Sequence, residues 1–217
     1  ATKITFINEI ANLCEKSNID VKEVAIGMGL DERIGSRFLR PGPPYGGSCF
    51  PKDTRALVST GRMFNTNLSV VKSVINSNDK RTNLLLNKIS KIMNNKIKKK
   101  NITFLGVTFK PGTDDMRESS SLKIMPALIR KGAHINYYEP TGKKKELKSK
   151  NINFFENIKD ACKMADLIII HTEWNEFKQL NFKKITKKRN FKVFDMRNLY
   201  STSEMKKNKI NYFSIGR

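Results

Sequence analysis

Cys49 combines a reactive side chain with a local setting that favours its reactive form. It lies in the run Gly46-Gly47-Ser48-Cys49-Phe50-Pro51-Lys52-Asp53. Pro51 suits the first turn of a helix, so the thiol is expected just ahead of a helix N-terminus. The positive end of the helix dipole, together with the cation at Lys52, lowers the pKa of such a thiol and raises its thiolate fraction. The run therefore predicts a nucleophilic cysteine.

The neighbours of this cysteine support the same chemistry but also allow a plainer interpretation. Gly46 and Gly47 let the backbone approach a ligand closely or take a positive φ. Asp53 lies four residues after Cys49, in the first helical turn, where its carboxylate could project back toward the loop. In the alternative, Cys49 is a small buried apolar residue and Asp53 only complements the helix dipole. Spacing alone leaves both readings open.

A second group of candidates follows an apolar run at residues 102–107. The loop after it carries Lys110 and Arg117, and a helix is expected to begin near Ser119. Two cations beside a helix N-terminus are suited to binding a phosphate. The alternative is a surface loop in which Arg117 pairs with Asp114 or Asp115.

Arg197 lies in a third loop, at the end of the run Asp195-Met196-Arg197-Asn198. This loop follows another apolar strand, at residues 192–195. In open α/β sheets, ligands bind beyond the C-terminal ends of the strands. Arg197 is therefore expected on the same sheet edge as Lys110, where both could serve one anionic ligand.

The elements that must position these loops divide the chain into two halves. In residues 1–97, apolar residues recur at the spacing of helix faces. The pattern predicts a first helix through Cys14, a second at 21–28, a third from Pro51 to about Phe64 and a long one from about residue 68 to Met93. The long amphipathic helix is read as core, with a dimer interface as the bolder option.

In residues 98–217 short apolar runs alternate with helical segments, which predicts parallel strands joined by right-handed crossovers. The continuous run Leu167–Ile170 fits the middle of a sheet that is covered on both faces. The fold class expected is thus α/β, with a helical unit at 1–97 followed by a Rossmann-like, doubly wound unit at 98–217. The five expected strands are 102–107, 135–138, 167–171, 192–195 and 212–215.

Composition excludes several other classes of protein. The 217 residues carry 42 basic and 20 acidic side chains, a formal net charge of +22. The lysines are scattered and lack the aromatic interleaving that stacks bases, so a nucleic-acid partner is not expected. No apolar run approaches the length of a membrane span. Three widely spaced cysteines and two histidines argue against a disulfide framework and a metal site, and a reducing cytoplasm is the expected compartment.

Four stretches together resemble the UDP-glucose/GDP-mannose dehydrogenase family. The first is the segment from Arg40 to Asp53 around Cys49, and the second is the helix start from Phe6 to Glu15. The third is the loop 106–121, with its Phe-Lys-Pro-Gly-Thr-Asp-Asp-Met-Arg-Glu-Ser core. The fourth comprises Thr172-Glu173-Trp174 and Phe194-Asp195-Met196-Arg197. The likeness runs in order over essentially the whole chain.

The resemblance implies a central all-helical dimerisation domain at 1–97 and a UDP-sugar-binding α/β domain at 98–217. It implies an NAD-dependent, four-electron oxidation of UDP-glucose to UDP-glucuronate through a thiohemiacetal and a thioester on Cys49, in a homodimer formed through the long helix. Asp53 matches a carboxylate that assists proton transfer. Lys52 and Arg117 match positions near the cofactor. The positions that match substrate contacts are Arg33 (reaching the partner subunit's substrate), Phe38, Leu39, Arg40, Tyr45, Gly46, Lys110 and Arg197.

The resemblance also implies an NAD-binding Rossmann domain and a catalytic Lys–Asn pair upstream of the position that matches Ala1. Neither is in this sequence. We therefore expect the chain to be a piece of a longer enzyme that is inactive by itself. The nucleotide sugar stays open between UDP-glucose, GDP-mannose and a UDP-N-acetylhexosamine. Two further alternatives are a non-catalytic nucleotide-sugar-binding protein and a basic nucleic-acid binder.

Overall fold

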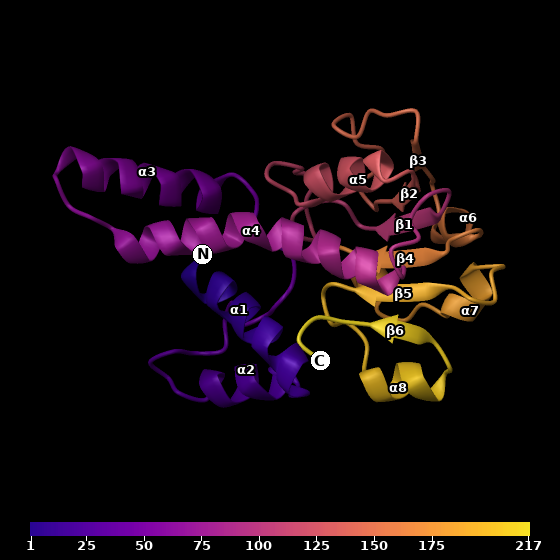
Figure 1. The fold of residues 1–217 in the computed structure, drawn as a ribbon, viewed down its shortest axis with the longest axis horizontal. Coiled ribbons are helices and arrows are strands. Elements are labelled where there is room, and N and C mark those ends of the chain that lie inside the picture. Colours follow the sequence, from indigo (N-terminus) through magenta and orange to yellow (C-terminus); the bar gives the residue numbers. More distant parts are fainter.

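A computed structural model describes residues 1–217 and shows four helices followed by a mixed α/β region (Figure 1). The helices are α1 (Thr2–Ser17), α2 (Val21–Gly29), α3 (Cys49–Met63), α4 (Ser69–Ile92), α5 (Ser121–Arg130), α6 (Ile158–Cys162), α7 (Phe182–Ile185) and α8 (Thr202–Lys207), with a 3₁₀ turn at Asn175–Phe177. The strands are β1 (Asn101–Leu105), β2 (His134–Tyr138), β3 (Ile152–Phe154), β4 (Leu167–Ile170), β5 (Lys192–Asp195) and β6 (Asn211–Phe213).

The four expected helices of the first half are all present. Asp20 caps α2 by accepting a hydrogen bond from the amide of Lys22, which satisfies one of the free amides of the first turn. The loop 30–48 then leads to α3, which runs beside α4 in the opposite direction (Figure 1). Gly61 allows this return, because a Cβ there would lie 2.9 Å from the carbonyl oxygen of Thr66.

The second half is a six-stranded parallel sheet of order β3-β2-β1-β4-β5-β6. This order confirms the doubly wound α/β prediction and places the change of direction between β1 and β4, where such sheets bind ligands. All four residues of β4 are buried, as the continuous apolar run predicted. The expectation of five strands was wrong. The strand that was not expected is β3, which lies at the edge of the sheet and follows a lysine-rich stretch. Its three residues are too few to show an alternating pattern.

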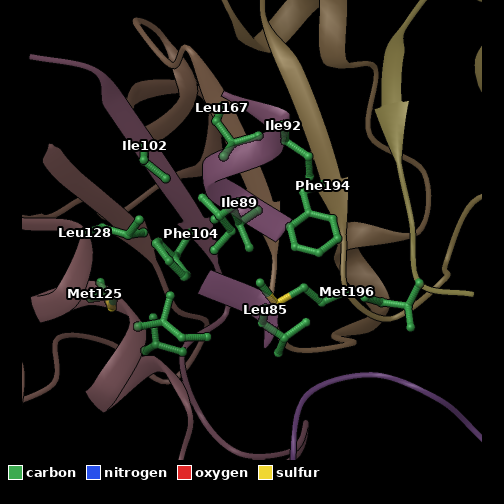
Figure 2. Packing of buried hydrophobic residues seen from close by; sticks show 14 of the residues in the cluster. Leu85, Ile89, Ile92, Ile102, Phe104, Met125, Leu128, Leu167, Phe194 and Met196 are labelled. Carbon is green, nitrogen blue, oxygen red and sulfur yellow. The ribbon is translucent and has the colours of Figure 1, made fainter. Parts of the chain in front are cut away.

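The C-terminal half of α4 covers one face of the sheet. Figure 2 shows Leu85 and Ile89 of this helix among side chains from the strands and from α5. The helical region and the sheet therefore share one apolar cluster. Its fully or nearly fully buried members include Leu85, Ile89, Ile92, Ile102, Phe104, Met125, Leu128, Leu167, Phe194 and Met196.

A second cluster covers the opposite face of the sheet, beneath α6, α7 and α8. Its members include Ile168 and Ile170 of β4, Val193 of β5 and Phe182 of α7. Helices on both faces are what a parallel sheet requires. None of the helices is both long and apolar enough to cross a membrane. The expected boundary at residue 97 falls in the turns between α4 and β1, and a division into two domains there stays a prediction.

Candidate active site

Cys49 is the first residue of α3 and its side chain is exposed. It was expected just ahead of the helix, and the helix begins at Cys49 itself. Cys14 and Cys162 are buried, as expected, and burial raises the pKa of the Cys162 thiol to about 12. All three thiols are free. Cys49 is thus the exposed thiol of the chain, and the buried, apolar alternative for it does not hold.

The glycines before Cys49 let its loop dock against the loop that follows β1. A Cβ on Gly46 would lie 2.5 Å from the carbonyl oxygen of Glu118. Gly47 has a φ of 81° and lies against the ring of Phe109, which a Cβ would approach to 2.7 Å. The amide of Gly47 donates to the carbonyl of Arg117 over 2.8 Å. The Cys49 loop is therefore held at the carboxyl edge of the sheet, beside the expected phosphate-binding loop.

Arg197 lies at the same edge, but its side chain is largely occupied by the protein. Its Nε donates to the carbonyl of His171 over 2.7 Å, and Nη2 donates to the carbonyl of Phe109 over 3.2 Å. It also forms an ion pair with Glu173 at 2.8 Å. Burial lowers the pKa of Arg197. The expected neighbourhood with Lys110 is present: Lys110 is exposed, with its Nζ 5.5 Å from the centre of the adjacent Phe109 ring.

Arg117 forms the ion pair that the plainer interpretation predicted. Its Nε and Nη2 donate to the two carboxylate oxygens of Asp115 over 3.0 and 2.8 Å. These bonds raise the pKa of Arg117 and lower that of Asp115. The Arg117 side chain is still 68% exposed and is close enough to Cys49 for the thiolate charge to act on it. The ion pair therefore orients the Arg117 guanidinium near Cys49 without burying it.

Asp53 and Lys52 extend from the first turn of α3 into solvent. They form an exposed ion pair at 3.3 Å, with 64% and 75% of their side chains accessible. Asp53 was expected to project back toward the loop, but its carboxylate is paired with Lys52 instead. Lys52 is three residues after Cys49 on the same helix, so its cation lies on the same side of α3 as the thiol.

The other predicted substrate contacts differ in what they expose. Phe38, with a φ of 67°, is exposed, and so is Arg40. Leu39 is buried in the main core, so only its backbone remains for a ligand. Tyr45 is buried against Phe50, with ring centres 5.9 Å apart.

Arg33 lies in the connection between α2 and α3. Its side chain is 89% exposed and pairs with Asp31 at 2.6 Å. It does not join the residues around Cys49 within this chain.

Sequence reasoning missed the polar residues that hold the Cys49 loop from behind. Asn8 of α1 and Asn78 and Arg81 of α4 are all buried and bond to the segment 42–45. A signal was available, because Asn78 and Arg81 continue the buried stripe of α4 that includes Leu85. Polar residues on a core-facing stripe usually have specific partners.

His171 is a buried base behind the site, and it should make the protein acid-sensitive. Its Nε2 lies 2.8 Å from the Ser120 hydroxyl, and burial lowers its pKa to about 3 from an ordinary value of 6.5. Between about pH 3 and pH 6.5 this histidine is protonated in the unfolded chain but neutral in the folded one. Its contribution to the free energy of unfolding is therefore fully present above pH 6.5 and is lost as the pH falls below that value. The expected slope is up to about 1.4 kcal/mol per pH unit.

The measurement is urea unfolding from pH 7 to pH 4 for the wild type, His171→Gln and the matched control His134→Gln. His134 is exposed at the start of β2. The steep acid loss should flatten in His171→Gln and persist in the control. Parallel curves for all three proteins would contradict this role for His171.

Comparison with known proteins agrees with this fold. Residues 1–80 match the central domain of the UDP-glucose/GDP-mannose dehydrogenase family, and residues 103–202 match its UDP binding domain. The chain is 41% identical over 220 residues to a UDP-glucose 6-dehydrogenase of Rickettsia prowazekii and 44% identical to one of Rhizobium meliloti. All of the chain is covered, together with 51% and 50% of these relatives. The chain thus spans about half the length of the curated relatives it matches.

Solved structures show the same arrangement of elements. A UDP-glucose dehydrogenase from Pyrobaculum islandicum superposes with a TM-score of 0.84 at 25% identity, covering 98% of this chain and 47% of that one. An NDP-N-acetyl-D-galactosaminuronic acid dehydrogenase from Methanosarcina mazei shares the fold, with a TM-score of 0.88 at 24% identity, over 100% of this chain and 48% of that one. With residues 1–80 and 103–202 matching its central and UDP binding domains in order, the chain belongs to the UDP-glucose/GDP-mannose dehydrogenase family.

Proposed function

We propose that the protein is a UDP-glucose 6-dehydrogenase, and that this chain supplies its nucleophile and its UDP-sugar site. The observation that carries the proposal is the docking of the exposed Cys49 loop on the Arg117–Glu118 backbone, at the edge of a sheet that matches a UDP binding domain. This docking brings a reactive thiol next to a place where a nucleotide sugar can bind. UDP-glucose is the substrate named for both curated relatives above.

Cys49 carries the reaction between two hydride departures. The C6 alcohol first loses a hydride and a proton and becomes an aldehyde. The Cys49 thiolate adds to the carbonyl carbon and gives a thiohemiacetal, which loses a second hydride and becomes a thioester. Water then hydrolyses the thioester, releasing the carboxylate and the thiol. Exposure of Cys49 at the start of α3 supports this role, since a carbonyl carbon can reach an accessible thiol.

NAD would supply the hydride acceptors, one molecule for each of the two oxidations. Within this chain, Lys52 and Arg117 fit the edge of such a cofactor. Their cationic heads are 75% and 68% exposed beside Cys49, and a pyrophosphate needs accessible cations. In this assignment the Asp115–Arg117 pair keeps the guanidinium oriented toward the anion.

The substrate would lie between the Cys49 loop and the carboxyl edge of the sheet. Lys110 is exposed there and suits a phosphate. The ring of Phe38 packs against that of Phe50, the residue after Cys49, with ring centres 6.1 Å apart, and Arg40 is exposed. Tyr45 and Gly46 belong to the same loop. Arg197 contributes chiefly by holding Phe109 and the carbonyl of His171 in place.

A homodimer through the long helix α4 accounts for two exposed features. Several large apolar side chains are exposed on the helical region. They include Leu57 and Met63 of α3, Phe64 just after α3, and Val70 of α4. Arg33, 89% exposed in the α2–α3 connection, could then reach the partner subunit's substrate. The cytoplasm, which keeps thiols reduced, suits three free cysteines.

The experiment is a substrate assay on the full-length gene product. NADH release is followed with UDP-glucose, GDP-mannose and UDP-N-acetylglucosamine in parallel, and light scattering reports the oligomeric state. Two NADH per UDP-glucose, with UDP-glucuronate as product, is the expected result. Turnover with GDP-mannose alone would replace the substrate, and nucleotide-sugar binding without turnover would favour the non-catalytic alternative.

Asp53→Asn should slow turnover by about 100-fold while the KM for UDP-glucose stays within about threefold. The expected cause is loss of a carboxylate that accepts and returns protons during oxidation and hydrolysis. Asp160→Asn is the control, since Asp160 lies in the first turn of α6, on the far side of the sheet. A large rise in KM with kcat preserved would assign Asp53 to substrate binding instead.

A further inference from the structure

Arg81 is a buried cation whose hydrogen bonds all go to carbonyl oxygens. Its side chain is 4% exposed. Its Nε donates to the carbonyl of Gly42 over 3.0 Å, and its Nη1 donates to the Asn12 side chain over 2.6 Å and to the carbonyl of Asn8 over 3.3 Å. Burial lowers its pKa to about 10. Burying a guanidinium with no carboxylate in contact costs several kcal/mol.

Two asparagines hold the same segment of backbone as Arg81 does. The Asn8 side-chain oxygen accepts from the amide of Gly42 over 2.8 Å. Asn78, three residues before Arg81 on α4, accepts from the amide of Tyr45 over 2.9 Å and donates to its carbonyl over 3.3 Å. Both backbone groups of Gly42 and both of Tyr45 are therefore bonded to side chains from α1 and α4.

The segment 42–45, held by these hydrogen bonds, leads directly to Cys49. The ring of Tyr45 packs edge-on against Phe50, the residue after Cys49. Gly42 lies against the turn that carries Arg197, since a Cβ on it would come within 2.9 Å of the carbonyl oxygen of Met196. Arg81 thus fixes the loop at Gly42, where it contacts the turn that carries Arg197. Asn78 fixes it at Tyr45, four residues before α3 begins.

We propose that Arg81, together with Asn78, is a positioning residue that fixes the placement and the reactivity of the Cys49 thiol. Its effect on turnover rests on the proposed function. Its effect on the thiol does not, because the hydrogen bonds act on the loop whether or not a nucleotide sugar is oxidised. A residue that served folding alone would change stability and leave the native thiol as it is.

The test compares Arg81→Met, Arg81→Lys and the control Lys80→Met in the full-length gene product. Lys80 is the exposed neighbour of Arg81 on α4, so its variant loses a cation without touching the loop. Native alkylation by iodoacetamide is followed at the Cys49 peptide from pH 6 to pH 10. The other two cysteines are buried, so this reaction reports Cys49. Steady-state kinetics with UDP-glucose and thermal unfolding are measured on the same samples.

We expect Arg81→Met to change the alkylation rate of Cys49 by about threefold or more, to shift its pH midpoint, and to lower kcat by about tenfold with little change in KM. Arg81→Lys should fall between, and Lys80→Met should match the wild type. A folded Arg81→Met protein with wild-type alkylation and kcat would overturn the proposal. If Arg81→Met does not fold, Asn78→Ala decides in the same way: altered alkylation supports the positioning role, and wild-type alkylation overturns it.

Discussion

Cys49→Ser should abolish formation of the acid product in the full-length gene product, with a loss on the order of 10³-fold or more. A serine hydroxyl is almost fully protonated at neutral pH, so it adds poorly to the aldehyde and forms no thioester. The thiol is exposed and the other two cysteines of this chain are buried, so neither of them can take its place. The measurement is product analysis by chromatography, with NADH release counted per nucleotide sugar.

Cys14→Ser is the matched control, because it makes the same exchange at a buried thiol of α1. It should lower stability modestly and leave the product unchanged. UDP-glucuronate formed at the normal rate by Cys49→Ser would rule out covalent catalysis by this residue. Accumulated aldehyde in that variant would instead locate the block at the second oxidation.

Gly46→Ala should displace the nucleophile through a single methyl group. The new Cβ would lie 2.5 Å from the carbonyl oxygen of Glu118 and 3.1 Å from the Cβ of Phe109. The Glu118 backbone and the Cβ of Phe109 cannot shift cheaply, so the Cys49 loop must lift from the loop after β1. We expect a loss of about 1–3 kcal/mol in the free energy of unfolding and a fall of about 100-fold in turnover.

Gly27→Ala is the control for this exchange. Gly27 lies inside α2 with no atom within 4 Å of a new Cβ, so alanine should gain up to about 1 kcal/mol of stability there. Urea unfolding and NADH release measure both quantities. Wild-type turnover in Gly46→Ala would mean that close docking of the two loops is not needed for catalysis.

The elements that could be predicted from the sequence are those whose apolar pattern extends over several residues. The apolar stripe of α4 and the continuous run of β4 each bury a face, so their patterns are strong. The short strand β3, with its intermediate and exposed residues, leaves no such pattern. The second helix, expected at 21–28, is present as α2, because its apolar residues recur at helical spacing.

The candidate site could be predicted in its members, but of its pairings the sequence anticipated only that of Arg117 with a neighbouring aspartate. Cys49 was singled out by its glycines and its helix start, which are local signals. The orientation of Asp53 toward Lys52 and the use of Arg197 by main-chain carbonyls depend on which rotamers the packed structure allows. Arg81 was missed because its partners lie 39 and 69 or more residues away along the chain.

The register of α4 limits how this protein can vary in length. Asn78 and Arg81 grip the Cys49 loop, and Leu85, Ile89 and Ile92 of the same helix are packed on the sheet. One residue added or removed between Arg81 and Leu85 would turn the two ends by about 100° relative to each other. Insertions and deletions should therefore be tolerated in the loops but excluded from this stretch. The number of residues between Arg81 and Leu85 therefore matters as much as their identity, because it sets the angle between the loop-binding and sheet-packing faces of α4.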